Sequence, residues 1–194
     1  MRDEKEIFLH ACCGPCAEWP VSELVSEDYI ITMFYHNPNI HPRFEHQRRL
    51  QNLKIVSDLW QIPLLVTDEY REDLWTERAY LESDKDRCHM CYRLRMDKTA
   101  EVAKNLGFQF FSTTLLVSPY QRHEAIIEAG HAAAQKYGLT FLYRDFRPGF
   151  RQGQQKARDH GLYRQKYCGC ILSLQESSFK DKIYKDFAGS TGET

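Results

Sequence analysis

Three short motifs contain all seven cysteines of this sequence. They are Cys12-Cys13-Gly14-Pro15-Cys16, Cys88-His89-Met90-Cys91 and Cys168-Gly169-Cys170. Thiolate is the form of cysteine that binds soft metals or attacks as a nucleophile, so these motifs indicate metal binding or redox chemistry. Because no cysteine is isolated in an ordinary apolar stretch, we expect the three motifs to converge on one shared site.

Each motif suits a sulfur site in its own way. Gly14 lets the backbone bend, and Pro15 suits the first turn of a helix, whose positive end favours ionised thiols. The spacing of Cys88 and Cys91 aims two sulfurs at one point, as zinc sites and iron–sulfur clusters both require. Gly169 gives the third motif the flexibility to close a dithiol ring or to hold one metal with both sulfurs.

Other interpretations of the cysteines stay open at this stage. Cys88 and Cys91 also fit a structural zinc site, and Cys13 and Cys16 also fit a thioredoxin-like redox pair. The third motif also fits two unconnected buried cysteines. A structural zinc takes four ligands and a [4Fe-4S] cluster takes four thiolates, so seven sulfurs exceed the need of either centre alone.

The composition describes an ordinary globular chain with no global basic field. The 194 residues are 42% hydrophobic and carry a net charge of −1, which argues against indiscriminate coating of nucleic acid. Local basic faces remain compatible with that charge, although solvated helix faces would look the same. The sequence shows no N-terminal signal pattern and no apolar run of membrane-spanning length, so we expect a cytoplasmic protein, in which structural disulfides are uncommon.

The alternation of apolar and helical segments predicts one α/β domain over residues 1–188, with a flexible tail at 189–194. We expect a Rossmann-like three-layer open sheet of about five mainly parallel strands with helices on both faces. The predicted strands are Ile7–His10, Tyr29–Tyr35, Pro63–Val66, Phe108–Thr114 and Thr140–Tyr143. Helices are predicted from Pro42 to Trp60, from Asp86 to Gly107, from Ser118 to Gly138, between Pro148 and Gly161, and after Cys170.

This order of elements also predicts where a ligand binds. In open parallel sheets, ligands bind outside the carboxyl ends of the strands, where the strand order reverses. The first predicted strand runs directly into the motif of Cys12, Cys13 and Cys16, and the fourth ends in Ser112-Thr113-Thr114. We therefore expect these two loops to meet at the site.

The ordered motifs resemble the signature of the epoxyqueuosine reductase (QueH) family from about residue 7 to about 175. The pieces that carry this resemblance are His10-Ala-Cys-Cys-Gly-Pro-Cys16, Tyr35-His-Asn-Pro-Asn-Ile40 with Pro42 and Glu45, Asp86-Arg-Cys-His-Met-Cys-Tyr-Arg93, Ser112-Thr-Thr-Leu-Leu-Val-Ser-Pro-Tyr-Gln121, Asp145-Phe-Arg147 and Tyr163-Arg-Gln-Lys-Tyr-Cys-Gly-Cys170. The combination is highly specific, whereas no single piece is. The family is also similar in fold to the HUP-like nucleotide-binding group, but this chain lacks the Ser-Gly-Gly phosphate loop of ATP-pyrophosphatases, which argues against ATP use.

The resemblance implies the last step of queuosine synthesis, the cobalamin-independent reduction of epoxyqueuosine to queuosine at the wobble position of a tRNA anticodon. It implies a [4Fe-4S] cluster held by Cys12, Cys13, Cys88 and Cys91, and an adjacent mononuclear iron for which Cys16 is a candidate ligand. Cys168 and Cys170 match a redox-active pair of the family. An external electron donor, such as a ferredoxin or flavodoxin system, completes this expectation, and a monomer is the default oligomeric state.

Further residues of these motifs are weaker candidates. Glu45 and Asp145 are candidate proton donors or hydrogen-bonding residues of the pocket, although a solvated surface carboxylate is an alternative for Glu45. His36 and Asn37 are candidates for lining the pocket, although Asn37-Pro38 also suits a simple turn. Candidate stacking and phosphate-binding residues, each with ordinary packing or solvation as its alternative, are Tyr120, Tyr163 and Tyr167 and then Arg144, Arg147, Arg151 and Arg164.

Overall fold

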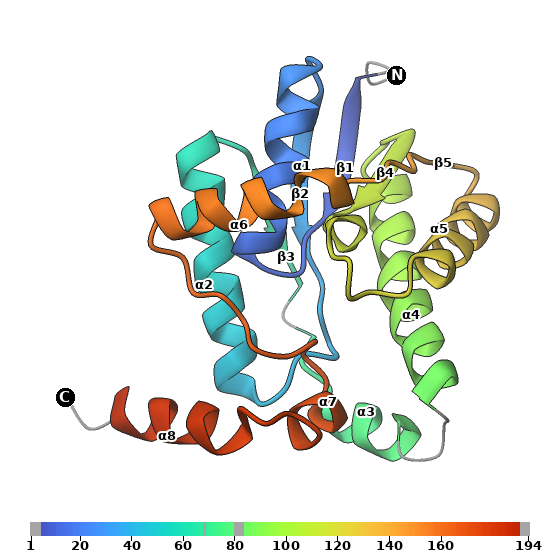
Figure 1. Ribbon diagram of the computed structural model, residues 1–194. Helices are drawn as coiled ribbons and strands as arrows, with labels where there is room; N and C mark the ends of the chain where they lie inside the picture. Colours follow the sequence, from blue (N-terminus) through green and yellow to red (C-terminus); the bar gives the residue numbers. More distant parts are fainter. Residues whose placement is uncertain (1–4, 68, 80–83, 191–194) are drawn as a thin grey trace.

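A computed structural model describes residues 5–67, 69–79 and 84–190. Its centre is a sheet of five parallel strands in the order β3-β2-β1-β4-β5 (Figure 1). The strands are β1 (Glu6–His10), β2 (Ile30–Tyr35), β3 (Leu64–Val66), β4 (Phe110–Thr113) and β5 (Thr140–Phe141). This arrangement confirms the predicted Rossmann-like α/β fold.

The apolar strand β1 occupies the middle of the sheet because both of its faces are covered. Ile7, Phe8 and Leu9 are fully buried, as expected for a parallel strand between two helical layers. On one side His10 lies opposite Phe34 of β2, and on the other it lies opposite Thr113 of β4. The chain order reverses between β1 and β4, so the two loops that follow them lie next to each other, as the sequence predicts.

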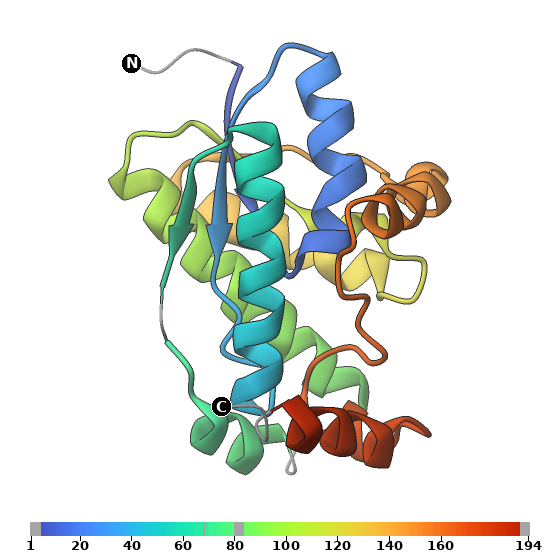
Figure 2. The ribbon, with the colours of Figure 1, turned by 90° about the vertical axis from the view of Figure 1, so that its left-hand side faces the viewer.

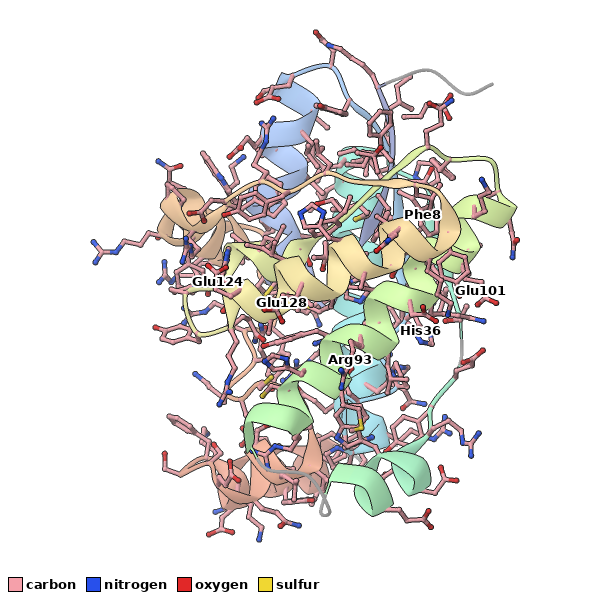
Figure 3. All side chains as sticks on the ribbon, turned by 90° about the vertical axis from the view of Figure 1, so that its right-hand side faces the viewer. Phe8, His36, Arg93, Glu101, Glu124 and Glu128 are labelled. Atoms are coloured by element: carbon pink, nitrogen blue, oxygen red, sulfur yellow. The ribbon has the colours of Figure 1, made fainter. Side chains whose placement is uncertain are left out.

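Two groups of helices cover the two faces of the sheet. Helices α1 (Gly14–Ser26), α2 (Arg43–Trp60) and α6 (Phe150–Asp159) pack together on one side, with α1 in contact with both α2 and α6. Helices α4 (Asp84–Asn105) and α5 (His123–Tyr137) pack against each other on the other side. Figure 3 looks onto this second layer, with Arg93 and Glu101 labelled on α4 and Glu124 and Glu128 on α5.

A third group of short helices lies beyond the carboxyl ends of the strands. It consists of α3 (Glu72–Ala79), α7 (Ile171–Gln175) and α8 (Lys180–Ser190), which gather at the bottom of Figures 1 and 2. Trp75, Ile171, Leu174 and Ile183 form a second apolar cluster there, together with Cys91 and Cys170. The short 3₁₀ helices η1 (Thr114–Val117) and η2 (Arg147–Gly149) complete the elements. No helix within the described ranges is both long and apolar enough to cross a membrane.

Several predicted boundaries are wrong. The helix predicted from Ser118 begins at His123, because Ser118 instead closes a turn in which its carbonyl accepts from Gln121 N at 3.3 Å. The single helix predicted after Cys170 is two helices, α7 and α8, and α3 was not predicted at all. Residues 189–190 of the predicted flexible tail belong to α8, and residues 191–194 lie outside the described residues.

Gly14 is required for close packing between α1 and α2. A Cβ atom at this position would lie 2.6 Å from the backbone oxygen of Asn52, an atom that can move only with α2 itself. The glycine therefore lets the start of α1 approach α2, which is a different role from the backbone bend that the sequence predicts.

We expect Gly14→Ala to lower the free energy of unfolding by about 1–3 kcal/mol, because overpacking forces the two helices apart. Urea unfolding measures this loss, and titration with a thiol reagent reports whether the neighbouring buried cysteines become accessible. Gly107→Ala is the control: its Cβ meets no atom, but the φ of +82° costs about 1 kcal/mol. A Gly14→Ala variant with the stability and thiol reactivity of the wild type would contradict this role.

Candidate functional site

Three cysteines meet where β1 passes into α1. Cys12 leaves the strand, Cys13 is the N-cap of α1, and Cys16 lies in its first turn. The three sulfur atoms all lie within 4.8 Å of one another, and the three side chains are buried. In the part of the chain that the structure describes, this is the one group of three or more such residues placed closely enough to hold a metal ion. This group of ligands fits a soft metal, because its three ligand atoms are all sulfurs and lie close together.

The loop that carries these thiols is held from both neighbouring strands. The backbone N–H of Cys12 donates to Thr114 Oγ1 at 3.4 Å, just beyond β4. On the other side, Asn37 Nδ2 donates to the carbonyl of Ala11 at 3.0 Å, just beyond β2. These two hydrogen bonds fix the direction in which the chain leaves β1, and the one to Thr114 confirms that the loops after the first and fourth strands meet.

His10 supports the same loop as a neutral imidazole. Burial lowers the pKa of His10 to about 3, so the ring carries no charge at neutral pH. Its Nε2 lies 3.2 Å from the carbonyl of His36 and therefore donates, which leaves Nδ1 to accept from Thr113 Oγ1 at 2.8 Å. The tautomer is thus assigned by its partners, and the ring ties β1 to both adjacent strands.

Cys12 is the thiol of this group that ionises most readily. Hydrogen bonds from the thiols of Cys13 and Cys16 lower the pKa of Cys12 well below its usual value. Burial raises the pKa of Cys13, and the hydrogen bond to Cys12 raises that of Cys16. The group therefore gathers one thiolate and two protons, and a bound cation would take the place of the protons.

The other four cysteines form a second group beside the first. Cys88, Cys91, Cys168 and Cys170 line a small, mostly apolar cavity of about 20 Å³ at the start of α4. Cys170 is the N-cap of α7, and its sulfur accepts from the backbone N–H of Ser173 at 3.4 Å. Cys168 is the exposed member and also lines the larger cavity described below, together with Cys12 and Cys16. Cys168 therefore connects the two thiol groups, because it lines both cavities.

Arg95 lies between the two thiol groups. One end of its buried guanidinium donates to Cys91 Sγ at 3.1 Å, and the other donates to Asn37 Oδ1 at 3.4 Å. Its charge lowers the pKa of Cys91, although burial outweighs it and raises that pKa to about 12. Arg95 also contributes to lowering the pKa of Cys12, so one buried cation serves thiols of both groups.

A large cavity opens over the thiols. Its volume is about 890 Å³, within the upper part of the range of about 300–1,000 Å³ that is usual for ligand sites. Six of its lining residues are cationic, and among the described residues no Asp or Glu lines it. The cations are Arg49, Arg95, Arg151, Arg158, Arg164 and Lys166. A nearly neutral chain has therefore concentrated positive charge on the walls of one cavity.

Glu45 and Arg49 form a buried ion pair that holds the third cysteine motif. Arg49 Nε donates to Glu45 Oε1 at 2.7 Å, and both side chains are almost completely inaccessible. The remaining N–H groups of Arg49 donate to the carbonyls of Tyr167 at 3.0 Å and Cys168 at 2.9 Å. Tyr163 donates to the second carboxylate oxygen of Glu45 at 3.0 Å. The alternative that Glu45 is a solvated surface carboxylate is therefore wrong.

The structure brings only some of the other candidate residues to the cavity. Tyr120, Tyr167, Arg151 and Arg164 line it. His36, Asn37 and Tyr163 do not line the cavity. His36 Nδ1 lies 2.8 Å from Thr67 Oγ1 (Figure 3), and Asn37 contacts Arg95 and Ala11. The ring of Tyr163 lies under the guanidinium of Arg48. The predicted turn at Asn37 does form, since Ile40 N donates to the Asn37 carbonyl at 3.2 Å.

Three charged candidates face other partners. Arg144 pairs with Glu23 and Glu27 at the far end of α1. Asp145 and Arg147 form a two-point ion pair with N–O distances of 2.6 and 2.7 Å, and Arg147 lowers the pKa of Asp145 below its usual value. The structure thus separates these residues from the thiols, and a carboxylate that holds its charge so firmly is a poor proton donor.

Sequence reasoning missed the roles of Arg49, Arg95 and Gln165. For both arginines a signal was present, because Glu45 and Arg49, like Cys91 and Arg95, stand four residues apart and so share a helix face. Gln165 gave no comparable signal. Its Nε2 donates to Cys16 Sγ at 3.3 Å, whereas its buried Oε1 has no hydrogen-bond partner.

The fold and the site define a Rossmann-like α/β protein whose buried cysteines, at the point of strand-order reversal, are suited to a metal. A family model described as "Epoxyqueuosine reductase QueH" matches residues 7–176, and the chain belongs to this family. Curated relatives of that name include proteins of Dehalococcoides mccartyi (30% identical, 88% of this chain and 93% of the relative), Thermotoga maritima (30%, 88% and 91%) and Haemophilus influenzae (32%, 89% and 73%).

We expect Glu45→Ala to lower the free energy of unfolding by about 3–5 kcal/mol, because it leaves the Arg49 guanidinium buried without its counter-charge. Urea unfolding of the two proteins measures the difference. Asp186→Ala is the matched control, since Asp186 also pairs with a cation four residues away, Lys182, but in an exposed position. That control should change stability by less than about 1 kcal/mol. Equal losses in the two variants would refute a structural role for the Glu45–Arg49 pair.

Proposed function

We propose that this chain is an epoxyqueuosine reductase that acts on epoxyqueuosine at the wobble position of tRNA. The reaction adds two electrons and two protons to the epoxide. Both C–O bonds break, the oxygen leaves as water, and the two carbons form the double bond of the cyclopentene of queuosine. The observation that carries the proposal is the group of buried thiols on the wall of a cation-lined cavity, in a chain whose family bears this name. Such a cavity suits an anionic RNA substrate.

The proposed cofactors are a [4Fe-4S] cluster held by Cys12, Cys13, Cys88 and Cys91 and a mononuclear iron for which Cys16 is a ligand. The gathering of Cys12, Cys13 and Cys16 and the adjacency of Cys91 through Arg95 support this assignment. When bound, these centres would supply single electrons and a Lewis acid for the epoxide oxygen. In this arrangement the positive charge of Arg95 offsets part of the negative charge of the thiolates.

Cys168 and Cys170 are the proposed store for both electrons and both protons, which the one-electron centres then replenish. Their oxidation to a disulfide releases two electrons and two protons, which is the stoichiometry that removal of the epoxide oxygen requires. The exposed position of Cys168 on the cavity wall supports this role, and Arg49 fixes the backbone that carries it. A ferredoxin or flavodoxin system would then restore the dithiol. In this proposal Glu45 is an anchor, which corresponds to its predicted hydrogen-bonding role and not to the role of a proton donor.

One observation favours a second candidate, a structural zinc held by Cys88, Cys91, Cys168 and Cys170. These four thiols line one small cavity, and four is the number of ligands that a structural zinc takes. Their sulfurs do not form a group as close as that of Cys12, Cys13 and Cys16, so this zinc would require the four side chains to move together. In that case only Cys12, Cys13 and Cys16 would remain for iron, and the chain could still act on RNA.

The protein reconstituted anaerobically with iron and sulfide should convert epoxyqueuosine in tRNA to queuosine when a strong reductant or a reduced flavodoxin is supplied. Mass spectrometry of the digested tRNA follows the loss of one oxygen atom. We expect the double variant Cys168→Ala/Cys170→Ala to keep its visible spectrum but to lose turnover. Turnover at the wild-type rate would rule out the dithiol, and absence of turnover in the reconstituted wild type would refute the proposed function.

Alanine substitutions at Cys12, Cys13, Cys88 and Cys91, tested one at a time, should each reduce bound iron and the broad visible absorbance of the reconstituted protein, because a cluster takes four thiolates. Metal analysis and an anaerobic spectrum measure both quantities. Full iron content in any one variant would remove that residue from the ligand set. Stoichiometric zinc without visible absorbance, lost in Cys88→Ala and kept in Cys12→Ala, would favour the zinc candidate.

A further inference from the structure

Apart from Lys156, which donates to Ser22 Oγ at 2.7 Å, the basic residues between positions 144 and 166 divide into two classes by their partners. Arg144 and Arg147 are neutralised by carboxylates, as described above. Arg151 and Arg158 of α6, and Arg164 and Lys166 of the segment that follows, line the cavity and take part in no ion pair among the described residues. The second class therefore offers uncompensated positive charge on both sides of the cavity mouth.

Helix α6 presents one continuous polar face to this cavity. Arg151, Gln154, Gln155 and Arg158 all line it, and their spacing of three and four residues places them on one face of the helix. The opposite face packs closely on α1, since a Cβ at Gly153 would lie 3.0 Å from Trp19 Cβ. Figure 1 shows α6 against α1, with the segment between α6 and α7 running down from its end. The packing of one face of α6 on α1 holds the helix in place, with its polar face directed at the cavity.

An aromatic platform and an unsatisfied acceptor complete the surface. Tyr120 is 84% exposed, and its ring meets that of Phe150 edge to face at 5.9 Å, with both rings on the cavity wall. Unstacked RNA bases rest on such rings. Deeper inside, Gln165 Oε1 is buried without a donor, beside the sulfur of Cys16. A ligand with a hydrogen-bond donor would satisfy it.

We infer that the polar face of α6 and the segment 164–166 bind a single-stranded RNA loop. Its phosphates lie along Arg151, Arg158, Arg164 and Lys166, and one unstacked nucleotide passes Tyr120 into the cavity. The inference rests on the proposed function, which identifies the loop as the anticodon loop. It adds the face on which the loop lies and the exclusion of Arg144 and Arg147. An acidic electron-carrier protein would also bind these positive charges, but it would make no use of the exposed ring of Tyr120 or of the hydrogen-bond acceptor of Gln165.

The test measures binding of an unmodified tRNA transcript, and of its isolated anticodon stem-loop, to the full chain by fluorescence anisotropy over a range of salt concentrations. The double variant Arg151→Gln/Arg158→Gln should weaken binding by about tenfold and reduce the slope of log K against log salt by about 1.4, since each contact to single-stranded phosphate contributes about 0.7. Tyr120→Ala should weaken binding by about tenfold without changing the slope.

The matched control is Arg144→Gln/Arg147→Gln, which removes the same charge from the same stretch of sequence and should leave affinity and slope unchanged. Thermal unfolding of every variant shows that it is folded. Equal effects of the two double variants would overturn the assignment to α6, as would α6 variants that bind RNA normally but require more flavodoxin for half-maximal reduction.

The same variants separate this inference from the proposed reaction. Normal RNA binding by the α6 double variant, with reduction of epoxyqueuosine by the reconstituted wild type, would refute the inference and leave the reaction intact. Loss of RNA binding in that variant, with no reduction by the reconstituted wild type, would support the binding surface and refute the reaction.

Discussion

The parallel pairing of β1 with β4 is the constraint on which the whole site depends. His10 lies opposite Thr113, so the chain leaves β1 and β4 at the same edge of the sheet. The cysteine loop therefore starts next to the loop that follows β4. Thr114 and Asn37 then hold the loop from its two sides. The sheet and these two hydrogen bonds therefore set the backbone that brings the sulfurs of Cys12, Cys13 and Cys16 together.

Buried cations extend this order beyond the sheet. Arg49 ties the segment of Cys168 to α2, and Arg95 lies between Cys91 and the loop of Cys12. Each places a positive charge in the interior, where a charge costs much free energy unless it is paired. The carboxylate of Glu45 compensates the charge of Arg49, and the nearby cysteine sulfurs compensate the charge of Arg95 in part. The arrangement is therefore complementary to anionic sulfur centres.

Much of the architecture could be predicted from the sequence, because it follows from local patterns. The strand ends fall within two residues of their predicted positions, because short apolar runs between turn residues are typical of buried parallel strands in an α/β chain. Gly138 ends α5 in the left-handed conformation, as its position after the periodic pattern indicates. Helix α3 has no such periodicity, because its apolar contact comes mainly from Trp75 against the distant α7 and α8.

The candidate site was predictable in its residue types and less so in its partners. The sequence indicates that the cysteines gather, but only tertiary packing decides that Cys168 and Cys170 join Cys88 and Cys91. Burial of Glu45 depends on residues 118 and more positions further along the chain, Tyr163 and Tyr167, which no local pattern reports. In the same way Arg144 and Arg151 cannot be told apart from the sequence. In the structure Arg144 pairs with Glu27, whereas Arg151 lines the cavity.

The second apolar cluster has a consequence for local stability at this end of the molecule. The few side chains that join α3, α7 and α8 form a patch separate from the main core, so this end can open while the sheet stays folded, at a lower free energy than global unfolding. Such an opening exposes Cys91 and Cys170 and leaves Cys12, Cys13 and Cys16 in place.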